Sequence, residues 1–207
     1  MEQRASEWFD ARWGLITASE LDCIVNGRLK RGDKKGARSD TAMRYMIELA
    51  GERITGRNSE HFVSKAMKDG IEREPEAIAM YQCKKCVLTE STGFHIHPTL
   101  PFSGASPDFL VGEDGGGEVK CPTLHTFLKW KIEGVAPEEH LPQIHWGMAC
   151  TGRKWWDFVA YHPDMPHGLN LMIVRVNRDN ELIEQYEKEV MAFELELREM
   201  VKKIRGM

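Results

Sequence analysis

The chain has 207 residues, of which 42% are hydrophobic and 29% charged, so it can bury one sizeable core, and its composition excludes a disordered or collagen-like protein. Lys and Arg number 28 against 32 Asp and Glu, a formal net charge of −4. This balance excludes a protein that coats nucleic acid through its overall charge, and any contact with DNA must use a local basic patch.

The first third of the chain is predicted to be helical. The predicted helices cover residues 6–13, 17–24, 39–54 and 59–81. Ser6 is a suitable cap for the first helix and Gly14 breaks it. A basic loop separates the second helix from the third, and Gly70 and Pro75 are possible breaks in the fourth.

The middle of the chain alternates with the period of β-strands. The predicted strands cover residues 87–92, 94–97, 104–111, 118–121, 155–162 and 169–177. The glycine-rich stretch 112–117 is predicted to be the turn of a hairpin between two of them. Helices are predicted over residues 123–133 and 138–150, and a long amphipathic helix over about 179–205. This order predicts a single domain, 1–207, of the α/β (α+β) class, with a central mixed β-sheet flanked by helices.

The compartment is predicted from hydropathy and cysteine count. The apolar stretch 169–176 is far shorter than the ~20 residues needed to span a bilayer, and the first residues lack the apolar run of a secretion signal. The five cysteines are an odd number, which argues for reduced thiols. We therefore expect a cytoplasmic protein without membrane association.

The most informative segment joins Ser-Pro-Asp108 to Glu118-Val-Lys120 through the glycine-rich turn. A hairpin of this length places both carboxylates beside one small volume, as a hard divalent cation such as Mg²⁺ requires. Lys120 lies two positions after Glu118 on the same strand face, where it could act on a metal-bound water, and the Val119 carbonyl could be a further ligand. A solvated hairpin would carry the same residue types, and Asp114 in the turn is a rival acid.

Three further groups of residues increase the weight of this pattern. Glu74 precedes a helical stretch and could add a carboxylate and support a second cation, although a solvated Glu-rich helix face would look the same. Gln143 lies on a predicted helix, where its amide could touch a phosphate or simply be a satisfied polar group. Arg12 and Ser19 flank a glycine turn at a helix start, which is either an anion site or a plain cap.

Two other clusters have open interpretations. The basic loop is predicted to contact the DNA backbone or minor groove, although most such loops are only solvated. Its predicted DNA-binding residues are Arg28, Lys30, Arg31, Lys34 and Lys35. Cys83 and Cys86 form half of a metal-binding motif without an obvious second pair, so we expect plain thiols.

Taken together, these segments resemble the lambda-exonuclease and YqaJ group of viral-type recombinases within the PD-(D/E)xK nuclease superfamily. The resemblance runs over residues 12–19, 70–74, 106–110, 117–122 and Gln143, in the family's order. It implies a restriction-endonuclease-like core and 5′-to-3′ digestion of one strand of linear double-stranded DNA, dependent on Mg²⁺, with Mn²⁺ as an alternative and two ions per active site. It also implies a phage or prophage origin, a ring-shaped homotrimer and a single-strand annealing partner.

The resemblance also implies roles for individual residues. Asp108, Glu118, the Val119 carbonyl and Glu74 would form the metal site, Lys120 would handle the nucleophilic water, and Arg12, Ser19 and Gln143 would bind the terminal 5′-phosphate. Phe109 stands where relatives carry a small residue, and we expect only a packing difference from it. The alternative functions are a restriction or junction-resolving endonuclease and a catalytically silent DNA-end-binding scaffold.

Overall fold

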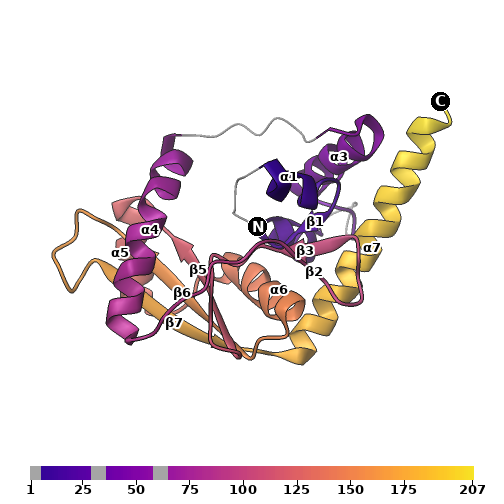
Figure 1. Cartoon of the computed structure of the whole chain (residues 1–207). Helices are drawn as coiled ribbons and strands as arrows, with labels where there is room; N and C mark the ends of the chain where they lie inside the picture. The colour runs from indigo at the N-terminus through magenta and orange to yellow at the C-terminus, as the bar shows by residue number, and fades with distance from the viewer. Residues whose placement is uncertain (1–5, 29–35, 58–64) are drawn as a thin grey trace.

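The computed structural model describes residues 6–28, 36–57 and 65–207. The helical first part comprises α1 (Ser6–Arg12), β1 (Ile16–Thr17), η1 (Ala18–Glu20), α2 (Leu21–Val25), α3 (Asp40–Thr55) and α4 (Lys65–Lys85). The remainder comprises β2 (His95–Ile96), β3 (Ser103–Ala105), β4 (Phe109–Val111), β5 (Gly115–Lys120), α5 (Leu124–Glu133), η2 (Glu138–His140), α6 (Leu141–Thr151), β6 (Trp155–Tyr161), β7 (Leu171–Asn177) and α7 (Asn180–Arg205). In Figure 1, α4 and α7 lie at opposite sides of the molecule.

The larger sheet has the strand order β4-β5-β6-β7 and is mixed, as predicted. β4 and β7 pair antiparallel with their neighbours, whereas β5 and β6 pair parallel, from Gly115 opposite Trp155 to Lys120 opposite Ala160. On one face, Ala77 and Tyr81 of α4 pack against Val119 and neighbouring strand residues. On the other face, residues of α5 and α6 pack against β6. Both faces of the central strands are therefore covered.

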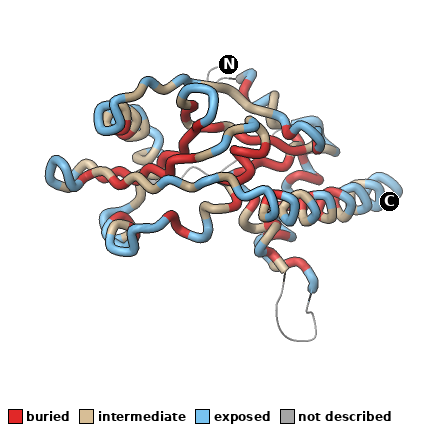
Figure 2. The backbone as a smooth tube through the Cα atoms, turned by 90° about the horizontal axis from the view of Figure 1, so that it is seen from below, coloured by how far each residue is buried: buried red, intermediate tan, exposed pale blue. Residues whose placement is uncertain are grey.

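A second, three-stranded sheet has the order β1-β3-β2. It packs with α2, α3, α6 and α7 into the largest core cluster, in which Ile16, Met46, Trp146 and Phe193 are almost fully buried. The long helix α7 follows one side of this cluster, and Figure 2 shows its C-terminal end exposed beyond the buried interior. None of the described helices is both long and apolar enough to cross a membrane.

Short-range signals in the sequence place several helix ends correctly. Ser39, Thr123 and Asp179 each cap a helix by accepting a hydrogen bond from the backbone N–H three residues later. The predicted apolar face of the last helix is confirmed for its central residues Val190 and Phe193, which are buried.

The structure corrects several predicted elements. Residues 104–111 form two strands in different sheets, β3 and β4, separated by the Ser-Pro-Asp segment. Residues 87–92 form no strand and contribute only an isolated bridge at Glu90. α4 continues through Gly70 and Pro75 without a break. Thr17 belongs to the short strand β1, and the helical turn begins after it.

The predicted hairpin is confirmed, but its turn is shorter than expected, because only residues 112–114 of the stretch 112–117 form the turn. Gly115, Gly116 and Gly117 belong to β5, and a Cβ on each would lie within 2.4 Å of a ring atom of Trp155, Trp156 or Phe109, respectively. Glycine is used here because aromatic rings lie directly on the backbone. Phe109 itself packs into the α4-side core, away from the acidic residue that precedes it, as expected.

Candidate active site

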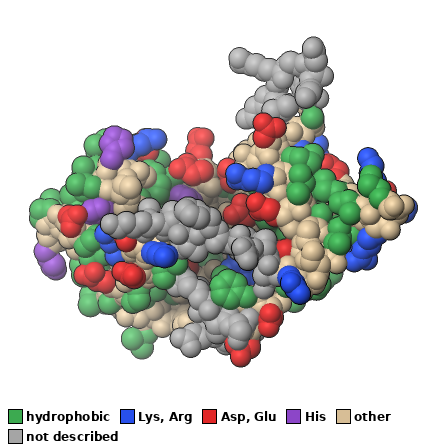
Figure 3. Space-filling view, turned by 90° about the horizontal axis from the view of Figure 1, so that it is seen from above, with side chains coloured by type: hydrophobic (Ala, Val, Ile, Leu, Met, Phe, Trp, Pro, Cys, Tyr) green, Lys and Arg blue, Asp and Glu red, His purple; other side chains and the backbone are tan. Residues whose placement is uncertain are grey.

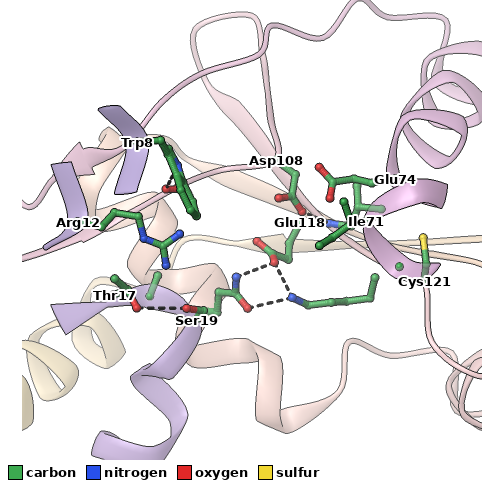
Figure 4. Close-up of a pocket in the computed structure, with 15 residues that line it drawn as sticks. Trp8, Arg12, Thr17, Ser19, Ile71, Glu74, Asp108, Glu118 and Cys121 are labelled. Atoms are coloured by element: carbon green, nitrogen blue, oxygen red, sulfur yellow. Dashed lines mark hydrogen bonds and ion pairs between the residues drawn. The ribbon is translucent and has the colours of Figure 1, made fainter. Parts of the chain in front are cut away.

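One pocket of about 440 Å³ lies between the two sheets, bordered by α1, η1, α4, β5 and α6. It is lined by every residue predicted for the catalytic, metal and phosphate roles: Arg12, Ser19, Glu74, Asp108, Glu118, Val119, Lys120 and Gln143. Figure 4 shows Asp108, Glu118 and Glu74 converging from the β3–β4 segment, β5 and α4, with Arg12 and Ser19 across the same cavity. The pocket thus joins segments more than 100 residues apart in the chain.

The hairpin register explains why the two carboxylates of Asp108 and Glu118 meet. Phe109 of β4 pairs with Gly117 of β5, so the residue before β4 lies beside the end of β5. Asp108 Oδ2 accepts a hydrogen bond from the Val119 N–H at 2.7 Å. Because the N–H and C=O of one strand residue face the same strand edge, the Val119 carbonyl is directed to the Asp108 side as well.

The electrostatics of the pocket favour a bound cation. Burial, followed by the nearby Glu118 and Glu74 carboxylates, raises the pKa of Asp108 well above its ordinary value. Burial alone would lower the pKa of Lys120, but Glu118 and Asp108 outweigh it and raise that pKa. A buried cluster of acids in which each negative charge disfavours the next is an environment that a divalent cation would neutralise.

The donor set fits a hard cation with water in part of its coordination shell. Asp108, Glu118 and the Val119 carbonyl supply oxygen ligands, which suit Mg²⁺ or Mn²⁺. Within the three described ranges, no three His, Cys, Asp or Glu side chains are grouped closely enough to form a complete cation site. Glu74 lines the pocket and acts on Asp108 through its charge, which suits an outer position or a second cation.

Lys120 and Gln143 both contact Glu118. Lys120 Nζ lies 2.6 Å from Glu118 Oε1, and Gln143 Nε2 donates to the same oxygen at 2.6 Å. Lys120 also donates to Gln143 Oε1 at 3.3 Å. Gln143 therefore lies in the predicted pocket, but the hydrogen bonds of its side-chain amide lie on the acidic side of that pocket.

The opposite wall carries Arg12 and two hydroxyls. The Arg12 guanidinium stacks on the Trp8 ring at 3.8 Å, and Trp8 Nε1 donates to Ser106 Oγ at 3.0 Å. Ser19 Oγ lies 3.2 Å from Thr17 Oγ1. Burial lowers the pKa of Arg12, but this leaves an arginine charged at neutral pH. A guanidinium with neighbouring hydroxyls forms a site for a terminal phosphate.

Seven lining residues were not among the predicted site residues: Trp8, Thr17, Ala18, Gly70, Ile71, Ser106 and Cys121. Trp8 could have been found, because it lies four residues before Arg12 on a helix and the two side chains must be neighbours. Ile71, an exposed apolar side chain on α4, gives no comparable signal in the sequence.

The predicted basic loop is only partly within the described residues. Lys30, Arg31, Lys34 and Lys35 lie outside them. Arg28 is described, and its guanidinium pairs with Glu189 at 3.0 Å and Glu196 at 3.2 Å on α7. Arg28 does not line the pocket, and its DNA contact stays a prediction. On the face in Figure 3, the coloured Lys and Arg side chains are interspersed with acidic and apolar ones.

The cysteines give no second site. All five are free, and Cys83 and Cys86 are exposed at the end of α4. Cys121 borders the pocket, where burial and the Glu74 charge raise the pKa of its thiol to about 12. A thiol with this pKa is not a nucleophile at neutral pH.

The mixed four-stranded sheet is covered by helices on both faces, and its acids and lysine lie on β5 and on the segment before β4. This arrangement is the restriction-endonuclease-like fold of alkaline exonucleases. Residues 7–154 match the model of the YqaJ-like viral recombinase domain. The chain therefore belongs to the YqaJ-like viral recombinase family.

Solved structures support this membership over the whole chain. The alkaline exonuclease LHK-Exo from Laribacter hongkongensis is 35% identical with a TM-score of 0.87, and the match covers 98% of this chain and 97% of that one. LHK-Exo in complex with dAMP matches with the same identity and coverage and a TM-score of 0.88. A phage-related exonuclease from Haemophilus somnus 129PT, 19% identical over 92% of this chain and 96% of its own with a TM-score of 0.71, shares the fold. The comparison with curated proteins gave no match.

Proposed function

We propose that the protein is an Mg²⁺-dependent exonuclease that digests one strand of linear double-stranded DNA from its 5′-phosphorylated end and leaves 3′ single-stranded overhangs. The observation that carries this proposal is the shared pocket: a carboxylate pair with a lysine lies opposite an arginine with hydroxyls. The first set suits phosphodiester hydrolysis and the second suits a terminal phosphate. The similarity to an alkaline exonuclease supports the same reaction class.

Each group has a role that follows from its place. Asp108, Glu118 and the Val119 carbonyl would hold the cation, with Glu74 beside them. A bound Mg²⁺ supplies Lewis acidity and lowers the pKa of coordinated water. Lys120, whose positive charge the nearby Glu118 and Asp108 favour, orients the attacking water and offsets negative charge that develops on the phosphate. Gln143 holds the side chains of Glu118 and Lys120 in place through its two hydrogen bonds.

The wall of the pocket that carries Arg12, Thr17 and Ser19, which we call the arginine wall, accounts for dependence on a DNA end. A terminal phosphomonoester carries more negative charge than an internal phosphodiester, so a guanidinium stacked on an aromatic ring favours the end. If Arg12 and Ser19 hold the terminal phosphate, the following phosphodiester would lie toward Asp108 and Glu118. This spatial order supports the 5′-to-3′ direction.

Family membership extends the proposal to recombination by strand annealing. We propose a ring-shaped homotrimer, a single-strand annealing partner and action in the cytoplasm of a bacterial host, with Mn²⁺ able to replace Mg²⁺ and two ions per site. Light scattering of the purified protein tests the trimer, and a monomer would contradict it.

The central test compares nucleotide release from linear duplex DNA carrying 5′-phosphates with release from a closed circle, each with Mg²⁺ and with chelator. We expect release only from the linear DNA with metal, and loss of at least ~10²-fold in Lys120→Ala. Lys154→Ala is the matched control, because Lys154 also pairs with a carboxylate, that of Asp114 at 3.0 Å, but on the surface. Cutting of the circle would favour an endonuclease, and unchanged turnover in Lys120→Ala would contradict the proposed chemistry.

A further inference from the structure

Gly14 joins α1, which carries Arg12, to β1 and η1, which carry Thr17 and Ser19. Its φ of +65° is a left-handed conformation suited to glycine. The conformation at this residue sets the angle between Arg12 and the two hydroxyls. Whatever holds Gly14 therefore also holds the arginine wall of the pocket.

Two consecutive residues of α3 hold both peptide groups of Gly14. The Gly14 N–H donates to Glu52 Oε2 at 3.0 Å in a buried hydrogen bond. Arg53 Nε donates to the Gly14 carbonyl at 2.8 Å. A Cβ on Gly14 would lie 3.1 Å from Arg53 Cγ, so the arginine stem also packs closely on the turn. Neither Glu52 nor Arg53 lines the pocket that contains Arg12.

We call the two contacts of Glu52 and Arg53 with Gly14 the clamp. This clamp is itself anchored to the protein core. Arg53 forms a bidentate pair with Glu194 of α7, with N–O distances of 2.9 and 2.8 Å, and the Glu194 side chain is only 2% exposed. A planar guanidinium can make this fork and still donate through Nε, which a lysine ammonium cannot do in the same geometry. Seven residues before Glu52 on α3, the Tyr45 hydroxyl accepts from the Thr17 N–H at 3.0 Å. α3 thus holds the backbone of this segment at three points.

We propose that Glu52 and Arg53 are positioning residues for the 5′-phosphate site: they fix the Gly14 turn and so keep the Arg12 guanidinium at a set distance from Thr17 and Ser19. The inference rests on the proposed function of that wall. Neither residue touches the acidic side of the pocket, so the clamp should govern recognition of the DNA end rather than hydrolysis.

The experiment measures kcat/KM on linear duplexes with 5′-phosphate and with 5′-hydroxyl ends. We expect Glu52→Ala and Arg53→Lys to lower the phosphate-to-hydroxyl ratio about tenfold or more, mainly through KM, because small displacements of a positioning group have large effects. The rate on hydroxyl ends should stay within about twofold of wild type. Glu52→Gln should restore the wild-type ratio, because an amide oxygen still accepts from the Gly14 N–H.

Arg175→Lys is the matched control, because Arg175 makes a similar bidentate pair with buried Asp157, at 2.8 and 2.9 Å, and neither residue lines the pocket. It should lose stability but keep the ratio. Amide hydrogen exchange at Gly14 provides a second readout, with faster exchange expected in Glu52→Ala. A wild-type phosphate preference that survives Glu52→Ala and Arg53→Lys would overturn this inference alone. A wild-type enzyme without that preference would overturn the proposed phosphate site and this inference together.

Discussion

Gln143 donates its amide to Glu118 Oε1 across 2.6 Å, the same distance that separates this oxygen from Lys120 Nζ. One carboxylate oxygen therefore holds two donors, while the other remains available to a cation. This relationship links α6 to the end of β5, and we propose that Gln143 positions Glu118 and Lys120, while the phosphate contact that the family resemblance implies stays a prediction.

Replacing Gln143 by leucine should weaken cation binding. The change removes the donor to Glu118 and the acceptor for Lys120 at similar side-chain size. Partners that orient metal ligands contribute about 10- to 100-fold in affinity or activity, so the Mg²⁺ concentration for half-maximal nuclease rate should rise about tenfold. Gln82→Leu is the control, because Gln82 of α4 donates to Thr89 and neither residue lines the pocket. Unchanged Mg²⁺ dependence with a lower preference for phosphorylated ends would return Gln143 to the phosphate role.

Trp8 should affect recognition of the DNA end in two separable steps. Trp8→Phe keeps a ring under the Arg12 guanidinium but removes the hydrogen bond to Ser106, and we expect KM for phosphorylated ends to rise about threefold. Trp8→Leu removes both contacts, and the rise should reach about tenfold. Trp155→Leu is the control, because the Arg175 guanidinium stacks on the Trp155 ring at 3.5 Å and neither residue lines the pocket. Equal KM values for Trp8→Leu and wild type would refute this role.

Gly117→Ala should destabilise the protein by about 2–3 kcal/mol, measured as the free energy of unfolding in urea. The new Cβ would lie 2.0 Å from Phe109 Cζ, so the ring that fills the α4-side core must move. Gly51→Ala on α3 is the opposite case, because no atom lies within 4 Å of its Cβ and alanine favours a helix. It should stabilise by about 0.5–1 kcal/mol. Equal effects of the two substitutions would contradict the packing of rings on β5.

Stability should fall as the pH decreases below 6.5, in part because of His97. Burial, and then the Arg178 charge, lowers the pKa of His97 from 6.5 to about 4, although its Nε2 lies 3.3 Å from Glu187 Oε1. The unfolded chain takes up a proton at a higher pH than the folded one, so the contribution is complete above pH 6.5 and is lost toward pH 4. Between pH 7 and pH 5 the loss should be about 2 kcal/mol. Urea unfolding of His97→Gln should show a correspondingly smaller decrease, and parallel curves would contradict the assignment.

Signals that act over a few residues predicted the fold well. The helix starts near Ser39, Thr123 and Asp179 were predicted correctly, because a helix start depends on residues of the first turn. The second half of the stretch 112–117 was wrongly predicted to be turn, because glycine favours turns locally. What decides its structure is the pair of tryptophan rings on β6, about forty residues later, which only a strand without side chains can accept.

The same division holds for the candidate site. Asp108, Glu118 and Lys120 could be grouped from strand periodicity and hairpin length, and the structure places them in one pocket. The contact between Glu52 and Gly14 spans 38 residues and uses a backbone N–H, which carries no residue-type signal. Sequence reasoning thus found the groups that perform the proposed chemistry and missed those that hold them in place.

The Arg38 side chain, only 2% exposed, pairs with Glu189 and Glu196 of α7 and donates to the Ile24 carbonyl. A buried guanidinium without carboxylates is strongly destabilising. On the ribosome, α7 is synthesised after the other described elements, so Arg38 gains both carboxylate partners only after Glu196 has left the exit tunnel. The packing around Arg38 should therefore form only once translation has passed α7, although Arg38 is encoded early, and nascent chains stalled before Glu189 should remain sensitive to protease.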